Sequence, residues 1–345
     1  MRPVPIDNPP NPWAHATVEW LGEPPETTLR VFEDRTRKIL SENDSPDVPF
    51  RWSVNPYRGC FHGCAYCYAR RTHEYLGFGA GTDFDRMITI KPDAPALLRE
   101  AFEARSWKGE TVVFSGVTDC YQPLEAAYHL TRGCLEVCLE YRNPVGVITK
   151  SPLVERDVEL LAAIGVEARA SVGISIPFFD EAKARAIEPW VTTPARRLRT
   201  VERLARAGVN VGVMVAPIIP GLSDEDVPRI VAAARDAGAR WIGHAMLRLP
   251  GSVATVFAER LERALPLRAE KVLARTREMR GGKLYDSRFG ARMSGTGEYA
   301  DAVEKLFHTA VARAGFPPRD REKPSEAPST FRRPTDRGGQ LRLFG

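Results

Sequence analysis

The sequence lacks the features that mark membrane and secreted proteins. No apolar run approaches the roughly 18 residues that indicate a membrane-spanning helix, so we expect no membrane partner. The first residues, MRPVPIDNPPNPWAHATVEW, contain neither a basic segment followed by an apolar one nor a small-residue cleavage site, so we expect no secretion signal. These absences predict a cytoplasmic protein, in which thiols stay reduced.

Net charge is also low. The formal charge is +5, and residues 317–345 supply +3 of it, because they carry seven Lys and Arg against four Asp and Glu. The rest of the chain is therefore close to neutral, and its net charge does not by itself indicate a nucleic-acid partner.

Composition divides the chain into three zones. Residues 1–50 are rich in Pro, Asp and Glu and show little periodicity apart from a possible short helix at 36–42, so they predict an extended N-terminal arm that wraps the core. Residues 51–316 predict the core domain, with a helical extension at its C-terminal end. Residues 317–345 are polar and rich in Pro and Gly, which predicts a disordered tail.

Between residues 51 and 316, short β-branched runs alternate with amphipathic stretches typical of helices. Several of these stretches end in the glycine expected just past a helix C-terminus. Strand–helix repetition of this kind requires parallel strands joined by right-handed crossovers. The sequence therefore predicts an α/β fold, a partial (β/α)6 TIM-like barrel, with strands at 51–57, 111–116, 145–150, 166–174, 209–217 and 240–247.

Three of the six cysteines gather in one short segment, GCFHGCAYCYAR, which spans residues 59–70. The segment follows the first predicted strand, and parallel barrels keep their chemistry at the carboxyl ends of the strands. In a reduced compartment, clustered cysteines indicate a metal site or catalysis more often than disulfides. The three thiols belong to Cys60, Cys64 and Cys67.

Four kinds of site compete for these cysteines. A structural zinc site requires a fourth ligand, and His62 lies too close in sequence to complete a tetrahedron comfortably. A disulfide is disfavoured in the cytoplasm, and three thiols do not pair off completely. An electron-transfer cluster of the ferredoxin type uses four thiolates. The fourth kind is a 4Fe–4S cluster held by three thiolates, with one iron left open to a substrate or cofactor.

The C-x3-C-x2-C spacing, with a tyrosine directly before the third cysteine, resembles the signature of the radical S-adenosylmethionine (SAM) superfamily. The resemblance implies a 4Fe–4S cluster on Cys60, Cys64 and Cys67, whose open iron binds the amino and carboxylate groups of SAM. It further implies that an electron from the cluster cleaves SAM to methionine and a 5′-deoxyadenosyl radical, which abstracts hydrogen from the substrate. A reductant such as flavodoxin or ferredoxin is implied as a partner.

Over residues 53–217 the chain resembles the spore photoproduct lyase-like branch of this superfamily, and a bacterial subgroup is similar over nearly the whole chain. The similar segments within that range are CAYCY, SGVTD, VITKS, ASV and VAPI. In this branch the matching polar residues line the SAM pocket, which implies the same role here for Tyr66, Thr118, Lys150 and Ser171. Lys150 is expected to pair with the SAM carboxylate and Tyr66 to pack against the adenine. Ser171 or Thr118 is expected to hydrogen-bond the ribose or the carboxylate.

The chain departs from the lyase pattern at one position. The cysteine that returns a hydrogen atom to the product in that pattern falls on Gly116 here. Cys120 lies four residues further on and is a candidate for that role, although a lone cysteine is as often a small buried filler. Tyr68 is the second candidate catalytic residue. Cys134 and Cys138, spaced i and i+4 on a predicted helix, are interpreted as core or near-surface thiols without a ligand role.

Three further features lie near the predicted active face. His73 follows the cysteine segment, and Arg248 follows the sixth predicted strand, where it is well placed for substrate. The segment 280–299 interleaves arginines with Tyr and Phe. It either caps the barrel mouth and holds phosphates or forms a mobile surface loop.

The resemblance implies a lyase-like radical SAM enzyme that acts on a DNA lesion or a modified nucleotide. A tRNA or a small molecule is the alternative substrate. Outside the enzymes, the alternative is a non-catalytic iron–sulfur or zinc-binding protein.

The last residues, GGQLRLFG, suggest a further partner. Their core resembles the Gln-Leu-x-Leu-Phe peptide by which bacterial DNA polymerases and repair proteins dock on the replication sliding clamp. Three apolar anchors and one amide that fixes register are typical of a pocket-binding peptide. A chance match, or apolar residues that fold back onto the barrel, is the alternative. The matching residues are Gln340, Leu341, Arg342, Leu343 and Phe344.

Overall fold

The computed structural model describes residues 4–6, 29–317 and 329–334. Its central element is a seven-stranded sheet in which the strands from β4 to β11 pair in parallel and β3 pairs antiparallel with β4 at the edge. The parallel strands follow the chain order, so the predicted partial (β/α)6 TIM-like barrel is confirmed. The strands are, in spatial order, β11 (Trp241–Met246), β10 (Val211–Ile218), β9 (Ala170–Ser175), β8 (Val145–Thr149), β7 (Val112–Phe114), β4 (Trp52–Val54) and β3 (Leu40–Glu42).

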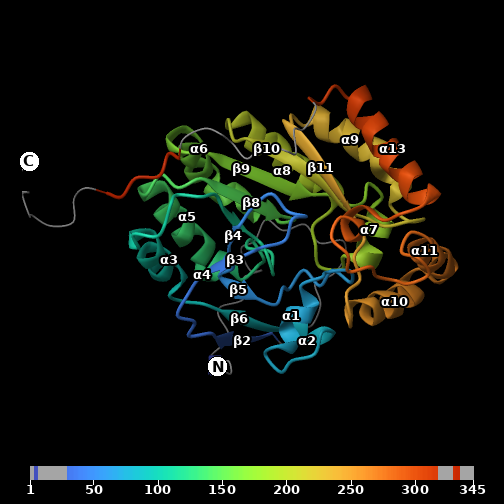
Figure 1. The fold of residues 1–345 in the computed structure, drawn as a ribbon, viewed down its shortest axis with the longest axis horizontal. Coiled ribbons are helices and arrows are strands. Elements are labelled where there is room, and N and C mark those ends of the chain that lie inside the picture. Colours follow the sequence, from blue (N-terminus) through green and yellow to red (C-terminus); the bar gives the residue numbers. More distant parts are fainter. Residues whose placement is uncertain (1–3, 7–28, 318–328, 335–345) are drawn as a thin grey trace, which may run out of the picture.

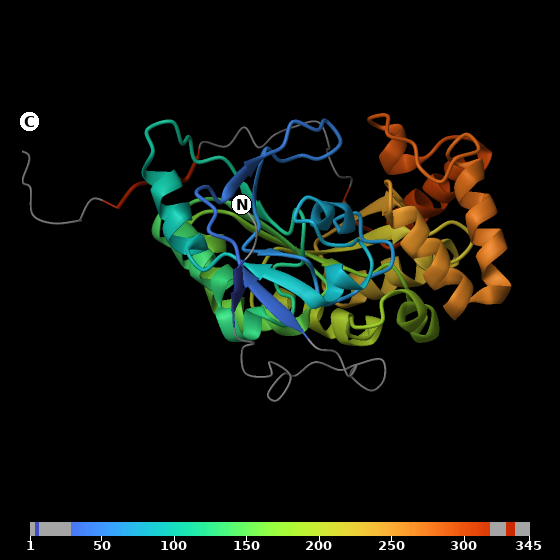
Figure 2. The same ribbon diagram turned by 90° about the horizontal axis from the view of Figure 1, so that it is seen from below.

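Helices cover one face of this sheet and both of its ends (Figure 1). In both views α3 and α5 lie at one end of the long axis and α10 and α11 at the other (Figures 1 and 2). None of the helices in the described ranges has the length and apolar character to cross a membrane. The helices are α1 (Arg70–Glu74), α2 (Thr82–Arg86), α3 (Ala94–Glu103), α4 (Glu125–Tyr128), α5 (Leu130–Glu140), α6 (Val158–Glu167), α7 (Glu181–Ile187), α8 (Pro194–Arg206), α9 (Val227–Asp236), α10 (Val253–Ala264), α11 (Pro266–Glu278), α12 (Ala291–Ser294) and α13 (Glu298–Arg313).

Side-chain alternation gives the sheet an apolar outer face and a more open inner face. Along β8, Val145 and Val147 are buried in the same cluster as Leu161 of α6, so they face the helices. The alternate residues of a strand point to the opposite side. Lys150, the residue directly after β8, therefore lies on the inner face at the carboxyl end of the strand.

A second, smaller sheet was not predicted. It has the strand order β1-β2-β6-β5 and lies beside the barrel (Figure 1). The segment 29–50 is therefore more than an extended arm, because it supplies strands to both sheets. The predicted helix at 36–42 is wrong: Leu40–Glu42 pairs antiparallel with β4, so cross-strand hydrogen bonds replace helical ones. The strands of the smaller sheet are β1 (Val4–Ile6), β2 (Arg30–Glu33), β5 (Tyr57–Arg58) and β6 (Met87–Ile90).

The fourth predicted strand starts too early. The stretch VEARASVGI predicts a strand at 166–174, but α6 continues to Glu167 and β9 begins at Ala170. Gly165 lies inside the last turn of α6 without a positive φ, so it does not end the helix. This shift moves every residue of the strand further from its carboxyl end than the sequence suggests.

Residues 329–334, within the predicted tail, lie against the domain. The Phe331 ring stacks on Tyr141 at 6.1 Å between ring centroids and meets Phe102 edge-on at 5.8 Å. Gly109, with φ of +72°, makes this approach possible, because a Cβ there would lie 2.2 Å from Phe331 Cβ. The Arg333 guanidinium donates to the carbonyls at the end of α3.

Candidate active site

The cysteine loop connects β5 to α1 and is folded tightly enough to bury its thiols. Cys60 and Cys64 are each 6% exposed, Cys67 is half-buried, and all three are free thiols. Burial raises the pKa of the Cys60 thiol, and the nearby Asp119, Cys64 and Cys67 raise it further, which shows that the three sulfurs share one small volume. Gly63 turns the loop at a φ of +63°, where a Cβ would lie 2.7 Å from Trp190 Cδ1.

Two buried polar side chains hold the loop by its carbonyl groups. Arg70 donates from Nε to the Cys64 carbonyl at 3.0 Å and from Nη2 to the Gly63 carbonyl at 2.9 Å. On the other side, Gln122 accepts from the Phe61 amide at 3.1 Å and donates to the Gly59 carbonyl. The loop conformation is thus fixed independently of any bound group.

The donor set fits an iron–sulfur cluster better than a single ion. Among the residues that the structure describes, no three His, Cys, Asp or Glu side chains are arranged to hold one metal ion. In a 4Fe–4S cluster each thiolate binds a different iron, so its sulfurs stand further apart than the ligands of one ion. Three free thiols on one fixed loop, two of them buried and one half-buried, match that requirement.

Asp119 joins the cysteine loop to the end of β8. It is the last residue of the SGVTD segment and was not among the predicted site residues. It accepts hydrogen bonds from Thr149 Oγ1 at 2.6 Å and from the Lys150 amide at 2.8 Å, and His62 Nδ1 lies 3.3 Å from its Oδ2. Burial raises the pKa of Asp119, but His62 and these hydrogen bonds outweigh it and lower the pKa to about 2. An acidic residue in the segment that follows a parallel strand, here β7, was the available signal.

Lys150 is half-buried and brings its ammonium group to the ring of Tyr66 in the cysteine loop. Its Nζ lies 5.6 Å from the centroid of the Tyr66 ring and makes no hydrogen bond or ion pair with a described side chain. Burial lowers the pKa of Lys150, but the charges of Cys64, Glu188 and Asp119 outweigh it and raise the pKa. The side chain therefore stays cationic and available to an anionic ligand.

Tyr66 faces this ammonium and is fixed by a buried ion pair that the sequence did not reveal. Its hydroxyl donates to Glu188 Oε1, and Glu188 Oε2 lies 2.5 Å from Arg197 Nη2. The carboxylate and the guanidinium are both fully buried, so each needs the other as a partner. Glu188 directly follows α7 and Arg197 lies in α8, both far from Tyr66 in sequence, where the residue types give no signal of the contact.

Two residues expected in the SAM pocket have other roles or positions. The Thr118 hydroxyl donates to the Gly59 carbonyl at 2.6 Å, so it supports the cysteine loop. Ser171 is the second residue of β9 and lines a cavity formed with residues at the amino-terminal ends of the neighbouring strands, so its expected role toward SAM stays a prediction. The residue at the carboxyl end of that strand is Ser175, which is buried.

Of the two candidate catalytic residues, one is displaced and one is well placed. Cys120 is fully buried in the apolar cluster between sheet and helices, so the structure favours the filler interpretation over a catalytic one. Cys134 and Cys138 are buried in the same cluster. Tyr68, by contrast, is 45% exposed and its hydroxyl donates to the Gly116 carbonyl at 2.7 Å.

An arginine lies over Tyr68 at the open side of the site. The Arg248 guanidinium carbon is 5.2 Å from the centroid of the Tyr68 ring, and its Nη1 lies 3.2 Å from Met293 Sδ. The Arg248 Nε is buried and makes no hydrogen bond within the described chain. Arg248 therefore offers a positive charge that no carboxylate takes up by direct contact.

The segment 280–299 is tied to the N-terminal part of the chain. Arg292 pairs with Asp47 and donates to Ser45 Oγ at 2.5 Å, and the Gly290 amide donates to Asp47. These contacts favour the capping interpretation over a mobile loop. His73 does not face the site: it is fully buried, with its ring centroid 5.1 Å from that of Phe78.

Comparisons with other proteins agree with this geometry. Residues 54–234 match the radical SAM superfamily. An uncharacterised protein of Mycobacterium tuberculosis is 37% identical over 234 residues, which cover 67% of this chain and 68% of that protein. An uncharacterised protein of Methanocaldococcus jannaschii is 27% identical over 196 residues, which cover 57% of this chain and 70% of that protein. The solved structure of spore photoproduct lyase complexed with dinucleoside spore photoproduct shares the fold, with a TM-score of 0.61, 18% identity and coverage of 85% and 84% of the two chains.

Proposed function

Because the chain belongs to the radical SAM superfamily, and is thus an enzyme that uses a 4Fe–4S cluster and SAM, we propose that Cys60, Cys64 and Cys67 hold the cluster. The observation that supports this assignment is the fixed loop, which holds the three free thiols beside the carboxyl end of β8. When bound, the cluster and SAM supply a 5′-deoxyadenosyl radical that removes a hydrogen atom from the substrate. The chain's own residues bind, orient and protect these groups.

Lys150 is proposed to bind the SAM carboxylate. The side chain is half-buried and cationic, and its ammonium has no side-chain partner among the described residues, so a carboxylate in reach would gain a charge-assisted hydrogen bond. Tyr66, locked by Glu188, presents its ring to the same volume and is proposed to pack against the adenine. Thr118 is proposed to act by holding the loop carbonyl of Gly59 and not by touching SAM.

Tyr68 is proposed as the hydrogen-atom donor in place of Cys120. Its phenol reaches the backbone of Gly116, the position at which the lyase pattern has its donor cysteine, and it is partly exposed. In this step the O–H bond of Tyr68 breaks and a C–H bond forms on the substrate radical, so the tyrosine becomes a neutral radical. One electron from the reductant and one proton from water restore the phenol. We propose flavodoxin or ferredoxin as that reductant, and the cytoplasm as the compartment.

A nucleic-acid lesion or a modified nucleotide is the proposed substrate. Arg248 supplies a positive charge at the open side of the site, and the exposed rings of Tyr68 and Phe289 lie beside arginines. Aromatic rings next to cations are typical of surfaces that bind nucleotide strands. The dinucleoside bound in the lyase structure supports the same substrate class. A tRNA or a small molecule remains the second candidate, because Arg248 would serve a single phosphate or carboxylate equally well.

The decisive experiment separates SAM cleavage from substrate choice. Anaerobically reconstituted, reduced protein should release 5′-deoxyadenosine from SAM, and the Cys64→Ala variant should not. A panel of ultraviolet-damaged oligonucleotides, damaged tRNA and free nucleotides, scored by product mass, then identifies the substrate. Tyr68→Phe should keep SAM cleavage but lose the reduced product. Absence of 5′-deoxyadenosine from the wild-type protein would leave the non-catalytic iron–sulfur interpretation.

A further inference from the structure

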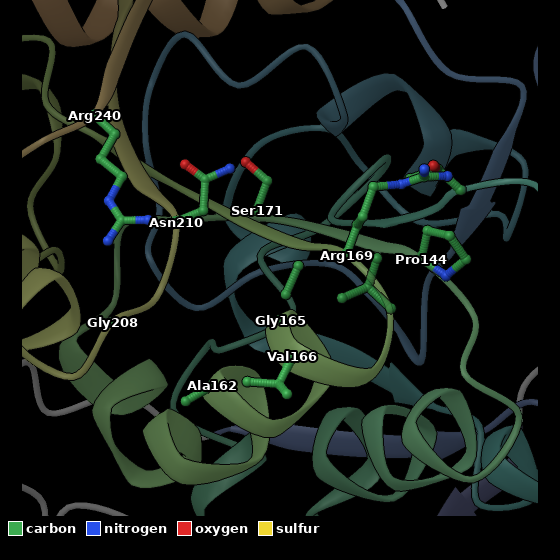
Figure 3. A pocket seen from close by; sticks show the side chains of 12 residues that line it. Pro144, Ala162, Gly165, Val166, Arg169, Ser171, Gly208, Asn210 and Arg240 are labelled. Atoms are coloured by element: carbon green, nitrogen blue, oxygen red, sulfur yellow. The ribbon is translucent and has the colours of Figure 1, made fainter. Parts of the chain in front are cut away.

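A cavity of about 510 Å³ lies at the amino-terminal ends of the parallel strands, at the opposite end of the barrel from the cysteine loop. It is formed where the chain leads into β7 to β11 and where α6 ends. Figure 3 shows Asn210 and Ser171 between Arg240 on one side and Arg169 on the other, with Val166 on the facing wall. The volume falls within the roughly 300–1,000 Å³ of small-molecule sites.

The charged side chains that line the cavity are all positive. Arg169 and Arg240 are its charged residues, and none of the residues that line the cavity in the described chain is acidic. Thr111, Ser171 and Asn210 add hydroxyl and amide groups. Two guanidinium groups with neutral hydrogen-bonding neighbours favour an anion.

Arg240 is placed by the backbone while its side chain remains unused. The Arg240 amide donates to the Val211 carbonyl at 2.8 Å, which fixes the residue at the start of β11. The guanidinium makes no hydrogen bond or ion pair with any described residue. On the neighbouring strand, the Asn210 carbonyl accepts from the Val172 amide at 2.9 Å, so the backbone fixes this residue too.

One wall of the cavity is apolar and exposed. Val166 is 84% exposed, which makes it one of the few large hydrophobic side chains at the surface, and Ala162 and Pro144 lie in the same lining. An apolar wall of this kind does not stabilise an inorganic anion. It would pack against the organic part of a larger ligand.

The cavity is separate from the active site. The inner face of the sheet above it is filled by Trp241, whose ring atoms lie 2.9 Å or less from the positions that a Cβ would take on Gly173 and Gly212. Ser171 lines the cavity, whereas Ser175 of the same strand lies at the carboxyl end, so the length of β9 separates the two sites. A ligand here would not compete with SAM.

We propose that this cavity binds a small organic phosphate of mononucleotide size. Arg240 holds the phosphate, and Ser171 and Asn210 donate hydrogen bonds to it or to the attached sugar. The organic part lies on Val166. The inference goes beyond the proposed reaction and does not depend on it.

The test is isothermal titration of the reconstituted holoenzyme with AMP, ribose 5-phosphate, inorganic phosphate and adenosine. AMP should bind more tightly than phosphate or adenosine, because it alone uses both the cationic and the apolar wall. Affinity should be the same with and without saturating SAM. Arg240→Ala should weaken AMP binding roughly ten-fold or more, the loss expected for a charge-assisted contact.

Controls keep the outcome interpretable. Val166→Asp, a change at an exposed position, should weaken AMP binding as well, whereas Arg263→Ala, which removes an exposed arginine of α10, should not. A circular dichroism melt of each variant shows that folding is preserved. The proposal is overturned if no probe binds at millimolar concentration, if Arg240→Ala leaves AMP affinity unchanged, or if SAM competes with AMP.

Discussion

The six cysteines show how surroundings decide what one residue type does. Cys60, Cys64 and Cys67 lie on a loop whose carbonyls are held by Arg70 and Gln122, and they pack in small apolar clusters outside the main core. The other three, Cys120, Cys134 and Cys138, lie in the apolar cluster between sheet and helices. The same thiol group thus has two roles in one chain, one in the proposed cluster site and one in the apolar core.

Replacing any cluster cysteine by alanine should therefore abolish iron binding. Wild-type protein reconstituted anaerobically should hold about four irons, and Cys60→Ala, Cys64→Ala and Cys67→Ala should each lose them, because three thiolates are the minimum set. Iron content and visible absorbance measure the result. Cys134→Ala is the matched control and should keep its iron. Loss of the cluster in this control would show that the ligand assignment is wrong.

Lys150→Ala should weaken SAM binding and leave the cluster intact. The mutation removes a half-buried cation with no described side-chain partner and no iron ligand, so the expected loss is about 1.5–3 kcal/mol, or roughly ten-fold or more in affinity. Equilibrium binding of SAM to the iron-loaded variant is the measurement. Lys183→Ala, which removes a lysine paired with Glu225, is the control and should bind SAM normally. Unchanged affinity in Lys150→Ala would remove this residue from the pocket.

At the scale of elements, sequence periodicity predicted the strands that a local residue pattern determines. It missed the smaller sheet, which depends on pairing between segments that are distant in sequence. The six parallel strands were predictable because each is a buried β-branched run between amphipathic stretches. The smaller sheet was not, because β2 and β6 are distant in sequence and their pairing leaves no local pattern. The start of β9 was misplaced for a related reason: Gly165 suggested the end of α6, but the helix runs past it.

The contact between residues 329–334 and the domain depends on one glycine. Gly109→Ala should displace this segment, because Gly109 has a φ of +72° and its new Cβ would lie 2.2 Å from Phe331 Cβ. We expect a loss of about 1–3 kcal/mol, which combines backbone strain with the exposed Phe331 ring. Chemical denaturation gives the stability, and limited proteolysis near Arg332 and Arg333 reports release of the segment.

Two further variants isolate the docking energy. Gly208→Ala is the matched control, because Gly208 has a φ of +82° but open space around it, so it should show the strain without the release. Phe331→Ala combined with Gly109→Ala should be less destabilising than the sum of the two changes, since both remove the same contact. Full additivity would contradict the docked arrangement.

At the scale of the whole molecule, the barrel separates two chemically different ends. The carboxyl end gathers three thiols, a half-buried lysine and a partly exposed tyrosine under Arg248. The amino end has a cationic cavity with an apolar wall and no thiol in its lining. Trp241 fills the inner face between them. A chain organised in this way can bind two ligands at once, each at its own end of the barrel.

The remaining prediction concerns how the whole protein meets a partner. Gln340–Phe344 lies outside the described residues, but it follows a segment, 329–334, that is held on the domain. A peptide of residues 335–345 should bind the bacterial sliding clamp with a Kd of roughly micromolar, as expected for so small an interface. Fluorescence anisotropy measures the binding, and Leu343→Ala with Phe344→Ala should abolish it because the two apolar anchors are lost.

The full-length protein supplies the sharper comparison. Phe331→Ala should leave clamp affinity unchanged, because Phe331 packs on Tyr141 and Phe102 of its own chain and does not belong to the peptide. Leu343→Ala with Phe344→Ala in the same protein should lose the clamp and keep SAM cleavage, because the peptide is remote in sequence from every proposed cofactor residue. If the peptide alone fails to bind, the link to replication or repair falls. The case for a nucleic-acid substrate would then rest on Arg248 and the aromatic rings around the active site.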